Sequence, residues 1–355
     1  LQGYQEIVLF FDNDEAGRQA VESASGILPA GRVKIARLDA YKDASDALQA
    51  GNADAVRKAI WDAKPYTPDG IVEGKDLLEL VTQPTKDYDH LYPFDGLNKM
   101  VQGIRYGELT TLTAGTGSGK SSLVRALAVD LLKKGEKVGY LALEESNKRS
   151  ALGLMSNARG KAYHIGEHGQ EELTDAFNDT IANWNLYLFD GFGSFDPDVI
   201  YNRIEYLASG LECRIIFLDH LSILLSGLDG DERRMIDSTM TRLRSLVERT
   251  GITLFLVSHL RRSNSDSNSH EEGGRVSLGQ LRGSHSISQI SDSVIAMERD
   301  QQSEDANNIT TLRVLKNRYS GSTGVATRLT YDLSSCQFYE TKNDEQPEFD
   351  PTEDF

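Results

Sequence analysis

The sequence has few cysteines and no long apolar run. Its 355 residues include two cysteines, Cys213 and Cys336, which are too few and too far apart for a disulfide framework or a cysteine-based zinc site. No apolar stretch approaches the roughly 18 residues of a membrane span. These absences exclude a disulfide-stapled secreted domain and a membrane-embedded protein, and they favour the reducing cytoplasm.

Basic residues are the minority among the charged ones. Lysine and arginine number 38 against 54 aspartates and glutamates, a formal net charge of −16. Residues 340–355 alone hold seven acidic side chains and one lysine. The balance argues against a broad basic surface around duplex DNA, but not against a DNA site built from a few loops. The chain opens at Leu1 with an apolar run and no signal-like leader, which suggests a truncated polypeptide.

The most informative segment is 114–121, which reads Ala-Gly-Thr-Gly-Ser-Gly-Lys-Ser. A strand-like run precedes it and a helix-like run follows, the context that a phosphate-binding loop requires. The backbone amides of such a loop and the helix N-terminus attract phosphates. We expect Lys120 to contact the β- and γ-phosphates and the Ser121 hydroxyl to hold Mg²⁺. Ala114 stands where the first glycine is usual, and a chance glycine-rich turn is the alternative. The expected nucleotide-binding residues of the loop are Gly115, Gly117, Ser118, Gly119, Lys120, Ser121 and Ser122.

Two predicted strands end in carboxylates. Strand 214–218 runs into Asp219, and strand 137–143 runs into Glu144 and Glu145. Because α/β sheets bind ligands at the carboxyl ends of their strands, Asp219 is predicted to be the magnesium-associated acid. Glu144 is predicted to be the base that accepts a proton from the attacking water. A capping role for the Glu144–Glu145 pair is the alternative.

Polar residues also follow two later strands. His259 ends the predicted strand 252–258, where it is placed to sense the γ-phosphate. Lys316 and Arg318 follow strand 310–315. In an oligomeric NTPase such an arginine enters the neighbouring subunit's site as an arginine finger, worth ~10³–10⁵ in rate. A structural histidine and solvated surface cations are the alternatives.

Strand-like and helix-like segments alternate from about residue 91 to 339, which predicts an α/β domain with a mostly parallel sheet. Residues 1–64 read as strand, helix, strand, helix. Residues 65–90 read as a linker in which 74–82 is a short amphipathic helix, and 340–355 as a disordered tail. Segment 261–274 is predicted to be a mobile loop. The expected strands of the main domain are 109–113, 137–143, 185–189, 214–218, 252–258, 293–297, 310–315 and 326–331.

Together, these motifs resemble the helicase half of the bifunctional primase–helicases of T-odd phages. The likeness rests on Glu-Glu-Ser at 144–146, Leu-Asp-His-Leu-Ser at 218–222, the segment 231–237, Ser-His at 258–259, Leu-Arg-Gly-Ser at 281–284, Lys-Asn-Arg at 316–318 and the terminal Asp-Phe. It covers essentially the whole chain; mitochondrial and bacterial replicative ring helicases are more distant relatives. It implies a RecA-like P-loop NTPase domain that forms a hexameric, or heptameric, ring around single-stranded DNA. Such a ring moves 5′ to 3′ with Mg²⁺ and dTTP or ATP, and a phage protein would work in the host cytoplasm.

The resemblance also implies residue roles. Glu144 is the catalytic base, Asp219 the metal-associated acid, His259 the γ-phosphate sensor and Arg318 the finger given to a neighbouring subunit. Gln289 links the γ-phosphate to the DNA-binding loops, and Arg299 and Tyr331 flank the nucleobase. The further implied nucleotide-site residues are Gln289, Arg299, Lys316 and Tyr331.

Two loops, 221–234 and 259–270, are implied to line the DNA channel. The second reads Ser-Asn-Ser-Asp-Ser-Asn-Ser after its two arginines, where the family pattern has more lysine. Backbone amides and hydroxyls also bind phosphates, so we expect binding that weakens at high salt. A plain surface loop is the alternative. The expected DNA-binding residues are Arg261, Arg262, Asn264, Arg282 and Gly283.

Residues 1–64 resemble the second half of the primase's Toprim metal-binding fold. Asp12, Asp14 and Asp43 fit its acidic metal positions. An acidic residue on an earlier strand, a zinc module and a template-binding part are absent from the sequence. We therefore expect no primer synthesis from this chain.

The tail resembles the segment through which such helicases contact the replicative polymerase, with Phe355 as an aromatic anchor; a solubilising tail is the alternative. Helix 74–82 resembles one that packs on the adjacent subunit, and a simple surface helix is the alternative. The leading hypothesis is the helicase. A RecA-like filament that does not unwind DNA is disfavoured by Gln289, the linker helix and the Toprim-like segment. A non-motor interaction module is disfavoured by the intact set of catalytic residues.

Overall fold

The computed structural model describes residues 1, 3–68, 70–83, 86–191, 196–225, 231–260, 269–270, 272–281, 284–303 and 306–341. The chain divides into two compact units, Leu1–Thr85 and Lys86–Phe355. The division falls inside the predicted linker. None of the described helices is long and apolar enough to cross a membrane.

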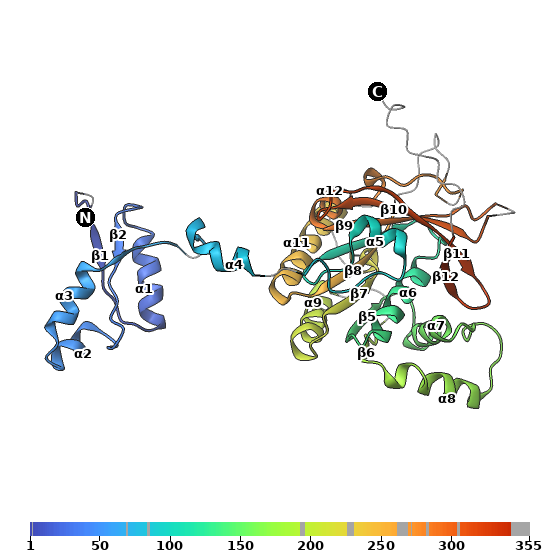
Figure 1. Ribbon diagram of the computed structural model, residues 1–355, viewed down its shortest axis with the longest axis horizontal. Coiled ribbons are helices and arrows are strands. Elements are labelled where there is room, and N and C mark those ends of the chain that lie inside the picture. The colour runs from blue at the N-terminus through green and yellow to red at the C-terminus, as the bar shows by residue number, and fades with distance from the viewer. Residues whose placement is uncertain are drawn as a thin grey trace, which may run out of the picture. The chain divides into compact units, whose positions relative to one another are not determined.

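The N-terminal unit contains a small sheet, three helices within residues 15–61 and a further short helix in the linker (Figure 1). Strand β1 (Ile7–Leu9) pairs in parallel with β2 (Val33–Ile35), and β3 (Lys64–Pro65) pairs antiparallel with β2. The helices are α1 (Glu15–Ser25), α2 (Ala44–Gln49) and α3 (Ala53–Trp61). Strand, helix, strand and helix were expected, whereas α2 and β3 were not. The predicted helix 74–82 is a 3₁₀ turn η1 (Gly74–Leu77) followed by α4 (Leu78–Thr82).

The second unit contains a nine-stranded sheet in the order β12-β11-β10-β9-β4-β8-β7-β5-β6. From β9 to β6 in that order, each strand runs parallel to the next one. On the other side of β9, strands β10, β11 and β12 extend the sheet with antiparallel pairing. All eight predicted strands are confirmed, and β12 was missed. The strands are β4 (Leu109–Ala114), β5 (Val138–Ala142), β6 (Leu186–Leu188), β7 (Ile215–Asp219), β8 (Thr253–His259), β9 (Ser293–Glu298), β10 (Ile309–Asn317), β11 (Gly324–Asp332) and β12 (Gln337–Glu340).

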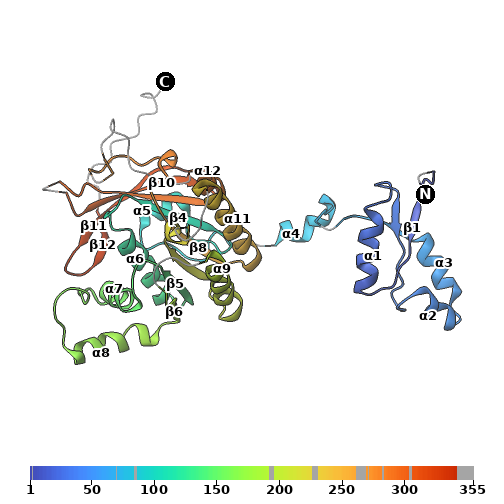
Figure 2. The same cartoon turned by 180° about the vertical axis from the view of Figure 1, so that it is seen from behind.

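Helices cover both faces of this sheet because alternate residues of each buried strand point to opposite faces. In β7, Ile215 and Phe217 pack in one core with α6 (Lys120–Lys133), whereas Ile216 and Leu218 pack in another with α11 (Glu232–Thr250). Figure 2, which views the molecule from behind, shows α11 and α9 of this second helix layer side by side. The other helical segments are α5 (Asp95–Val101), α7 (Asn147–Arg159), α8 (Gln170–Asn178), η2 (Ile181–Asn183), α9 (Pro197–Glu205), η3 (Tyr206–Gly210), α10 (Leu221–Leu225), η4 (Leu278–Gln280) and α12 (Ser284–Ile290).

This architecture confirms the predicted fold class, a RecA-like α/β domain with a mostly parallel sheet. Strands β4, β5, β7 and β8 are neighbours and run in the same direction, so their carboxyl ends share one edge. Residues 115, 143, 220 and 260 therefore begin four loops that lie close together. This edge holds the candidate site.

Candidate nucleotide-hydrolysis site

The phosphate-binding loop joins β4 to α6 and depends on its glycines. Gly117 has φ 73° and Gly119 has φ 93°, in the left-handed region where a side chain is strained. The Ser118 hydroxyl donates a 2.9 Å hydrogen bond to the carbonyl of Gly115. The loop thus turns sharply enough for α6 to begin at Lys120, with its N-terminal amides directed at the site.

The predicted phosphate- and magnesium-binding groups lie together. Lys120 Nζ donates to the carbonyls of Ala114 at 3.0 Å and Gly115 at 2.7 Å. The Ser121 hydroxyl donates to Asp219 Oδ2 at 3.2 Å. Hydroxyl and carboxylate oxygens are hard ligands that Mg²⁺ takes in phosphate-loop sites, so the residues fit that ion. Burial lowers the pKa of Lys120 to about 8, although Asp219 and Glu144 act to raise it. Burial has the opposite effect on the carboxyl of Asp219 and raises its pKa.

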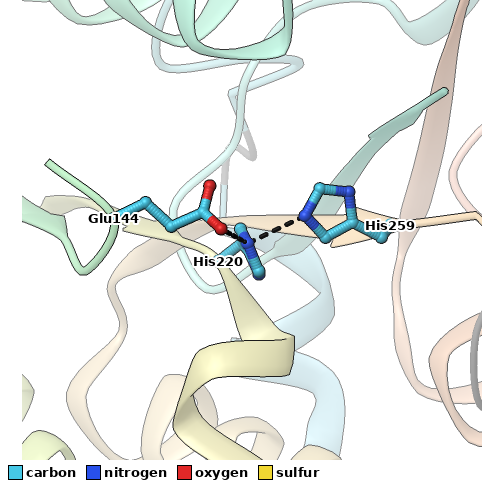
Figure 3. A group of neighbouring side chains, drawn as sticks. All are labelled: Glu144, His220 and His259. Carbon is cyan, nitrogen blue, oxygen red and sulfur yellow. Dashed lines mark hydrogen bonds and ion pairs between the residues drawn. The ribbon is translucent and has the colours of Figure 1, made fainter. Parts of the chain in front are cut away.

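Glu144 lies at the same edge, in contact with a histidine that the sequence did not single out. Its Oε1 is 2.5 Å from Nε2 of His220, which is buried. The same Nε2 lies 2.8 Å from Nε2 of His259 (Figure 3). Among the described residues, these three are the one group of potential metal ligands whose ligand atoms all lie within 4.8 Å of one another. His220 directly follows the predicted magnesium-associated acid Asp219, and this adjacency is the one feature of the sequence that indicates a place for His220 in the site.

The neighbouring Glu145 has a different environment from Glu144. Its carboxylate is 11% exposed and accepts a 2.6 Å hydrogen bond from Arg125 on α6 and a 2.9 Å bond from the Ser150 hydroxyl. The glutamate pair does not cap the following helix, because the N-cap of α7 is Ser146. Glu145 therefore ties the loop after β5 to α6, while the side chain of Glu144 is 53% exposed.

The side chains implied to flank the nucleobase also gather at the loop. A Cβ placed on Gly119 would lie 4.0 Å from Arg299 Nη1 and 4.0 Å from Phe338 Cζ. Tyr331 packs on Phe338 with 4.8 Å between ring centroids. Burial raises the pKa of the Tyr331 hydroxyl, and a hydrogen bond with Ser122 opposes that shift. Arg299 and the Tyr331–Phe338 pair thus both lie beside the phosphate loop, with Phe338 contributed by the unexpected strand β12.

A pocket of about 380 Å³ lies between the phosphate loop, the glutamates after β5 and His259. Its lining includes Lys120, Ser121, Glu144 and His259, together with Arg125. The volume is within the range of small-molecule sites. It can accommodate a nucleotide's phosphates between the loop and the carboxylates.

Three other predicted residues form a separate cluster. Arg318 Nη1 donates to Asp292 Oδ1 at 2.7 Å, and its Nη2 donates to the carbonyl of Gln289 at 3.1 Å. Lys316 Nζ donates to the same carbonyl at 2.9 Å and to that of Ser288 at 2.7 Å. The structure therefore brings Arg318, Lys316 and Gln289 together.

This cluster lies at the sheet edge opposite the phosphate loop of the same chain. Asp292 Oδ2 accepts a 2.9 Å bond from the backbone amide of Leu109, the first residue of β4. The phosphate loop follows the last residue of β4, Ala114. At about 3.3 Å per residue, the two ends of β4 are roughly 17 Å apart. A guanidinium held at Asp292 cannot reach a γ-phosphate bound at Lys120.

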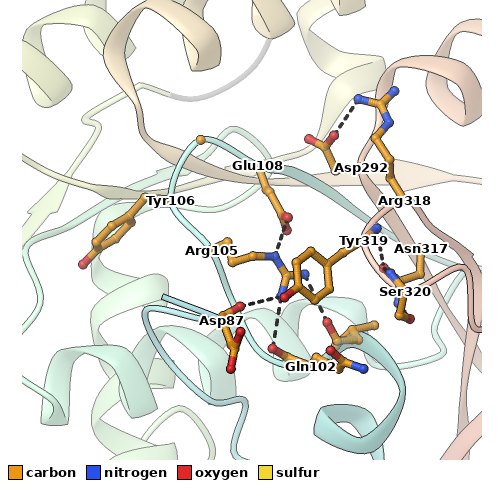
Figure 4. A network of polar contacts seen from close by, with 12 residues as sticks. Asp87, Gln102, Arg105, Tyr106, Glu108, Asp292, Asn317, Arg318, Tyr319 and Ser320 are labelled. Carbon is orange, nitrogen blue, oxygen red and sulfur yellow. Dashed lines mark hydrogen bonds and ion pairs between the residues drawn. The ribbon is translucent and has the colours of Figure 1, made fainter. Parts of the chain in front are cut away.

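The segment that carries Arg318 is firmly held. The guanidinium carbon of Arg105 lies 3.8 Å from the ring centroid of Tyr319 (Figure 4). Arg105 Nε donates to Glu108 Oε1 at 2.6 Å. The side chain of Asn317 donates to the carbonyl of Met100 at 3.0 Å. Arg318 therefore projects from an anchored turn, although half of its side chain is exposed.

In the N-terminal unit two of the three predicted metal aspartates act as helix caps. Asp14 accepts a 2.9 Å bond from the amide of Gly17 at the start of α1, and this bond lowers the pKa of Asp14. Asp43 accepts a 2.7 Å bond from the amide of Asp46 at the start of α2. Asp12, Asp14 and Asp43 are all described, and they form no group of three close ligands. A hollow of about 920 Å³ in this unit is not lined by any of them.

The predicted DNA-binding residues Arg261, Arg262, Asn264, Arg282 and Gly283 lie outside the described residues, as does Phe355. The two ends of the second loop are described. Leu260 and Leu281 form an isolated antiparallel bridge directly after His259. The bridge therefore closes the base of segment 260–281, which includes the second loop beyond His259, next to the pocket.

Fold and site define the class of protein. A phosphate loop after a central strand, a hydroxyl–carboxylate pair and a further carboxylate, all at one edge of a mostly parallel sheet, make this a RecA-like P-loop NTPase. Residues 92–340 match the model of the DnaB-like helicase C-terminal domain. The chain belongs to the DnaB-like helicase C-terminal domain family, whose members are NTP-hydrolysing DNA helicases. Residues 1–48 match a Toprim-like model.

Curated relatives agree with this assignment. The chain is 36% identical over 343 residues to a "DNA helicase/primase" of Enterobacteria phage T3, covering 93% of this chain and 60% of that protein. It is 23% identical to the "Twinkle homolog protein, chloroplastic/mitochondrial" of Arabidopsis thaliana, covering 95% of this chain and 50% of that protein. The chain thus spans between half and three fifths of the length of these relatives.

Solved structures share the fold. A solved ATPase domain superimposes with a TM-score of 0.63 at 19% identity, covering 78% of this chain and 100% of that chain. A DnaB-like replicative helicase, solved in a study of its interactions with primase, gives a TM-score of 0.62 at 18% identity, covering 90% of this chain and 74% of that one.

Proposed function

We propose that this chain is the motor of a hexameric replicative DNA helicase that hydrolyses dTTP or ATP and moves 5′ to 3′ on single-stranded DNA. The observation that carries the proposal is the position of Arg318. It lies at the edge opposite the phosphate loop of its own chain, bonded to Asp292. A hydrolysis site that needs an arginine finger is therefore complete only between two subunits.

Hydrolysis is assigned to the residues at the loop edge. Lys120 binds the β- and γ-phosphates, and Ser121 and Asp219 hold Mg²⁺, which neutralises charge on the phosphates when bound. Glu144 takes a proton from water as the water oxygen bonds to the γ-phosphorus. The bond from that phosphorus to the bridging oxygen breaks, which releases a nucleoside diphosphate and inorganic phosphate. Arg318 of the adjacent subunit stabilises the charge on the transferring group.

The helix within the linker supports assembly. Leu78 is 69% exposed, Leu80 62% and Val81 72%. A short helix with three exposed apolar side chains is typical of one that packs on another surface. We assign it to contact with the adjacent subunit of the ring.

DNA movement is assigned to the two loops that follow His220 and His259. The second loop is closed at its base by the Leu260–Leu281 bridge, so a shift of His259 is passed to the loop. Contact with single-stranded DNA is assigned to Arg261, Arg262, Asn264, Arg282 and Gly283. The acidic tail with Phe355 is assigned to polymerase contact, and residues 1–64 to a Toprim-like segment.

The interface site is tested by mixing two inactive variants. Lys120→Ala removes the phosphate-binding lysine, and Arg318→Ala removes the finger. Each alone should lose DNA-stimulated hydrolysis. Mixed subunits should recover part of it, because some interfaces combine an intact loop with an intact Arg318. No recovery from mixed assemblies of native size contradicts a site shared between subunits. Hydrolysis and assembly without unwinding favour the RecA-like filament instead.

A further inference from the structure

His220 is the buried residue at the centre of the catalytic edge. It is 3% exposed and sits between two side chains with assigned roles, the base Glu144 and the sensor His259. The base and the sensor approach its Nε2 from opposite sides (Figure 3). The three groups therefore form a chain, with His220 in the middle, and do not surround a common point as the ligands of a chelated ion would.

One nitrogen cannot serve both neighbours with a hydrogen. If Nε2 carries the hydrogen, it donates to Glu144 at 2.5 Å, which is a charge-assisted bond. If Nε2 is bare, it accepts from His259, and Glu144 loses its donor. Nδ1 of His220 is buried and makes no hydrogen bond within the described part of the chain. A hydrogen on Nε2 avoids a buried N–H at Nδ1 that would have no acceptor. Because Nε2 carries either one hydrogen or none, its bond to Glu144 and its bond to His259 exclude each other.

The two histidines also stand at the roots of both predicted DNA loops. His220 is followed at once by Leu221, where α10 and the first loop begin. His259 is followed by Leu260, which closes the base of the second loop. The imidazole rings meet edge to face with 4.0 Å between centroids. A movement of either loop that separates or rotates the rings changes the hydrogen bond available to Glu144.

We propose that His220 is a positioning residue that orients the base Glu144 and couples its orientation to both DNA loops. The proposal rests on the proposed function. When His259 turns to the γ-phosphate, the Nε2 hydrogen of His220 holds one carboxylate oxygen of Glu144 and directs the other at the attacking water. A base oriented by a third group is the general arrangement of such sites. His220 thus makes hydrolysis respond to DNA without itself contacting the nucleotide.

Two substitutions separate positioning from packing. His220→Gln places an amide donor about as far out as Nε2, whereas the amide of His220→Asn reaches only as far as Nδ1. His168→Gln is the control, because His168 bonds the carbonyls of Ala162 and Ile165 and does not line the pocket. For each chain, kcat and KM for hydrolysis are measured with and without single-stranded DNA, beside thermal unfolding.

We expect His220→Asn to lose roughly 10- to 100-fold in DNA-stimulated kcat, the range for a mispositioned group, with little change in KM. Its ratio of stimulated to basal kcat should fall towards one. His220→Gln should recover most of that ratio, and His168→Gln should behave as the native chain does. In a His259→Ala background the ratio of stimulated to basal kcat should already be close to one, and His220→Asn should lower that ratio little further, because both residues act on DNA stimulation through one contact.

Three results overturn the proposal. The first is a DNA-stimulated ratio in His220→Asn equal to that of the native chain. The second is an equal loss in His220→Gln and His220→Asn with lowered unfolding temperatures, which identifies a packing role. The third is a DNA-stimulated ratio that stays native in His259→Ala and falls only when His220→Asn is added. A native chain that hydrolyses no NTP, or does not respond to DNA, overturns the proposed function as well, so the two failures are distinguishable.

Discussion

Arg318 and Leu109 are joined through one carboxylate. Asp292 accepts a bond from the Arg318 guanidinium at 2.7 Å and one from the amide of Leu109 at 2.9 Å. It also pairs with Arg244 of α11. The proposed finger is therefore tied to the first residue of the strand that ends in its own phosphate loop.

Asp292→Asn tests that tie. The amide oxygen keeps an acceptor for Leu109, but Arg244 and Arg318 lose a carboxylate that is 7% exposed. We expect a loss of about 2 kcal/mol in the free energy of unfolding, as for a hydrogen bond to a charged group, and weaker hydrolysis in assembled subunits. Urea denaturation and steady-state kinetics measure both. Glu248→Gln, which removes a 63% exposed partner of Arg244, should cost under about 0.5 kcal/mol. Equal losses in the two variants would refute the central role of Asp292.

Glu144→Gln separates binding from chemistry. The phosphate contacts of Lys120 and Ser121 are untouched, so affinity for NTP should remain within a few-fold of native. Loss of the base should lower kcat by about 10²–10⁴-fold. Glu145→Gln is the matched control, because Glu145 pairs with Arg125; it should reduce stability more than hydrolysis. A larger kcat loss in Glu145→Gln would reverse the assignment.

Nucleotide affinity should fall as pH rises through about 8. The pKa of Lys120 is lowered to about 8 by burial, so its ammonium is charged below that pH and neutral above it. If only the charged form binds phosphate, KM rises about tenfold per pH unit above 8. Lys120→Arg stays protonated in this range and should give a flatter profile, even if binding is weaker throughout. Parallel profiles for the two chains would show that Lys120 does not titrate there.

Helix α4 should affect assembly and leave subunit stability unchanged. Replacing Leu78 and Val81 with serine removes two side chains that are 69% and 72% exposed, so the isolated unit loses little packing. We expect smaller assemblies at a given concentration and an unchanged unfolding midpoint. Ile27→Ser is the control, since Ile27 is 85% exposed on the same unit outside the linker. Mass photometry that gives native assemblies for the double variant would assign α4 to a simple surface helix.

Local patterns allowed much of this site to be predicted from the sequence. An apolar strand followed by a polar residue is visible in a single segment, and parallel strands bring such ends together. This is why Lys120, Ser121, Glu144 and Asp219 were found and do meet at one edge.

The parts that were missed depend on contacts between distant segments. Asp292 and Leu109 are separated by 183 positions, and His220 and His259 by 39. No local periodicity reports such pairs. Strand β12 and helix α2 are short and partly exposed, so their apolar patterns are weak. The caps at Asp14 and Asp43 show why acidic residues before a helix also fit a plain structural role.

Strand displacement on a forked duplex with a 5′ single-stranded tail distinguishes a helicase from an ATPase that only coats DNA. The assay compares dTTP and ATP with Mg²⁺, and uses Glu144→Gln as the inactive control. The account predicts unwinding by the native chain, dependent on hydrolysis and absent from a fork with only a 3′ tail. DNA-stimulated hydrolysis without strand displacement on either fork would contradict it, and would identify a RecA-like filament-forming ATPase.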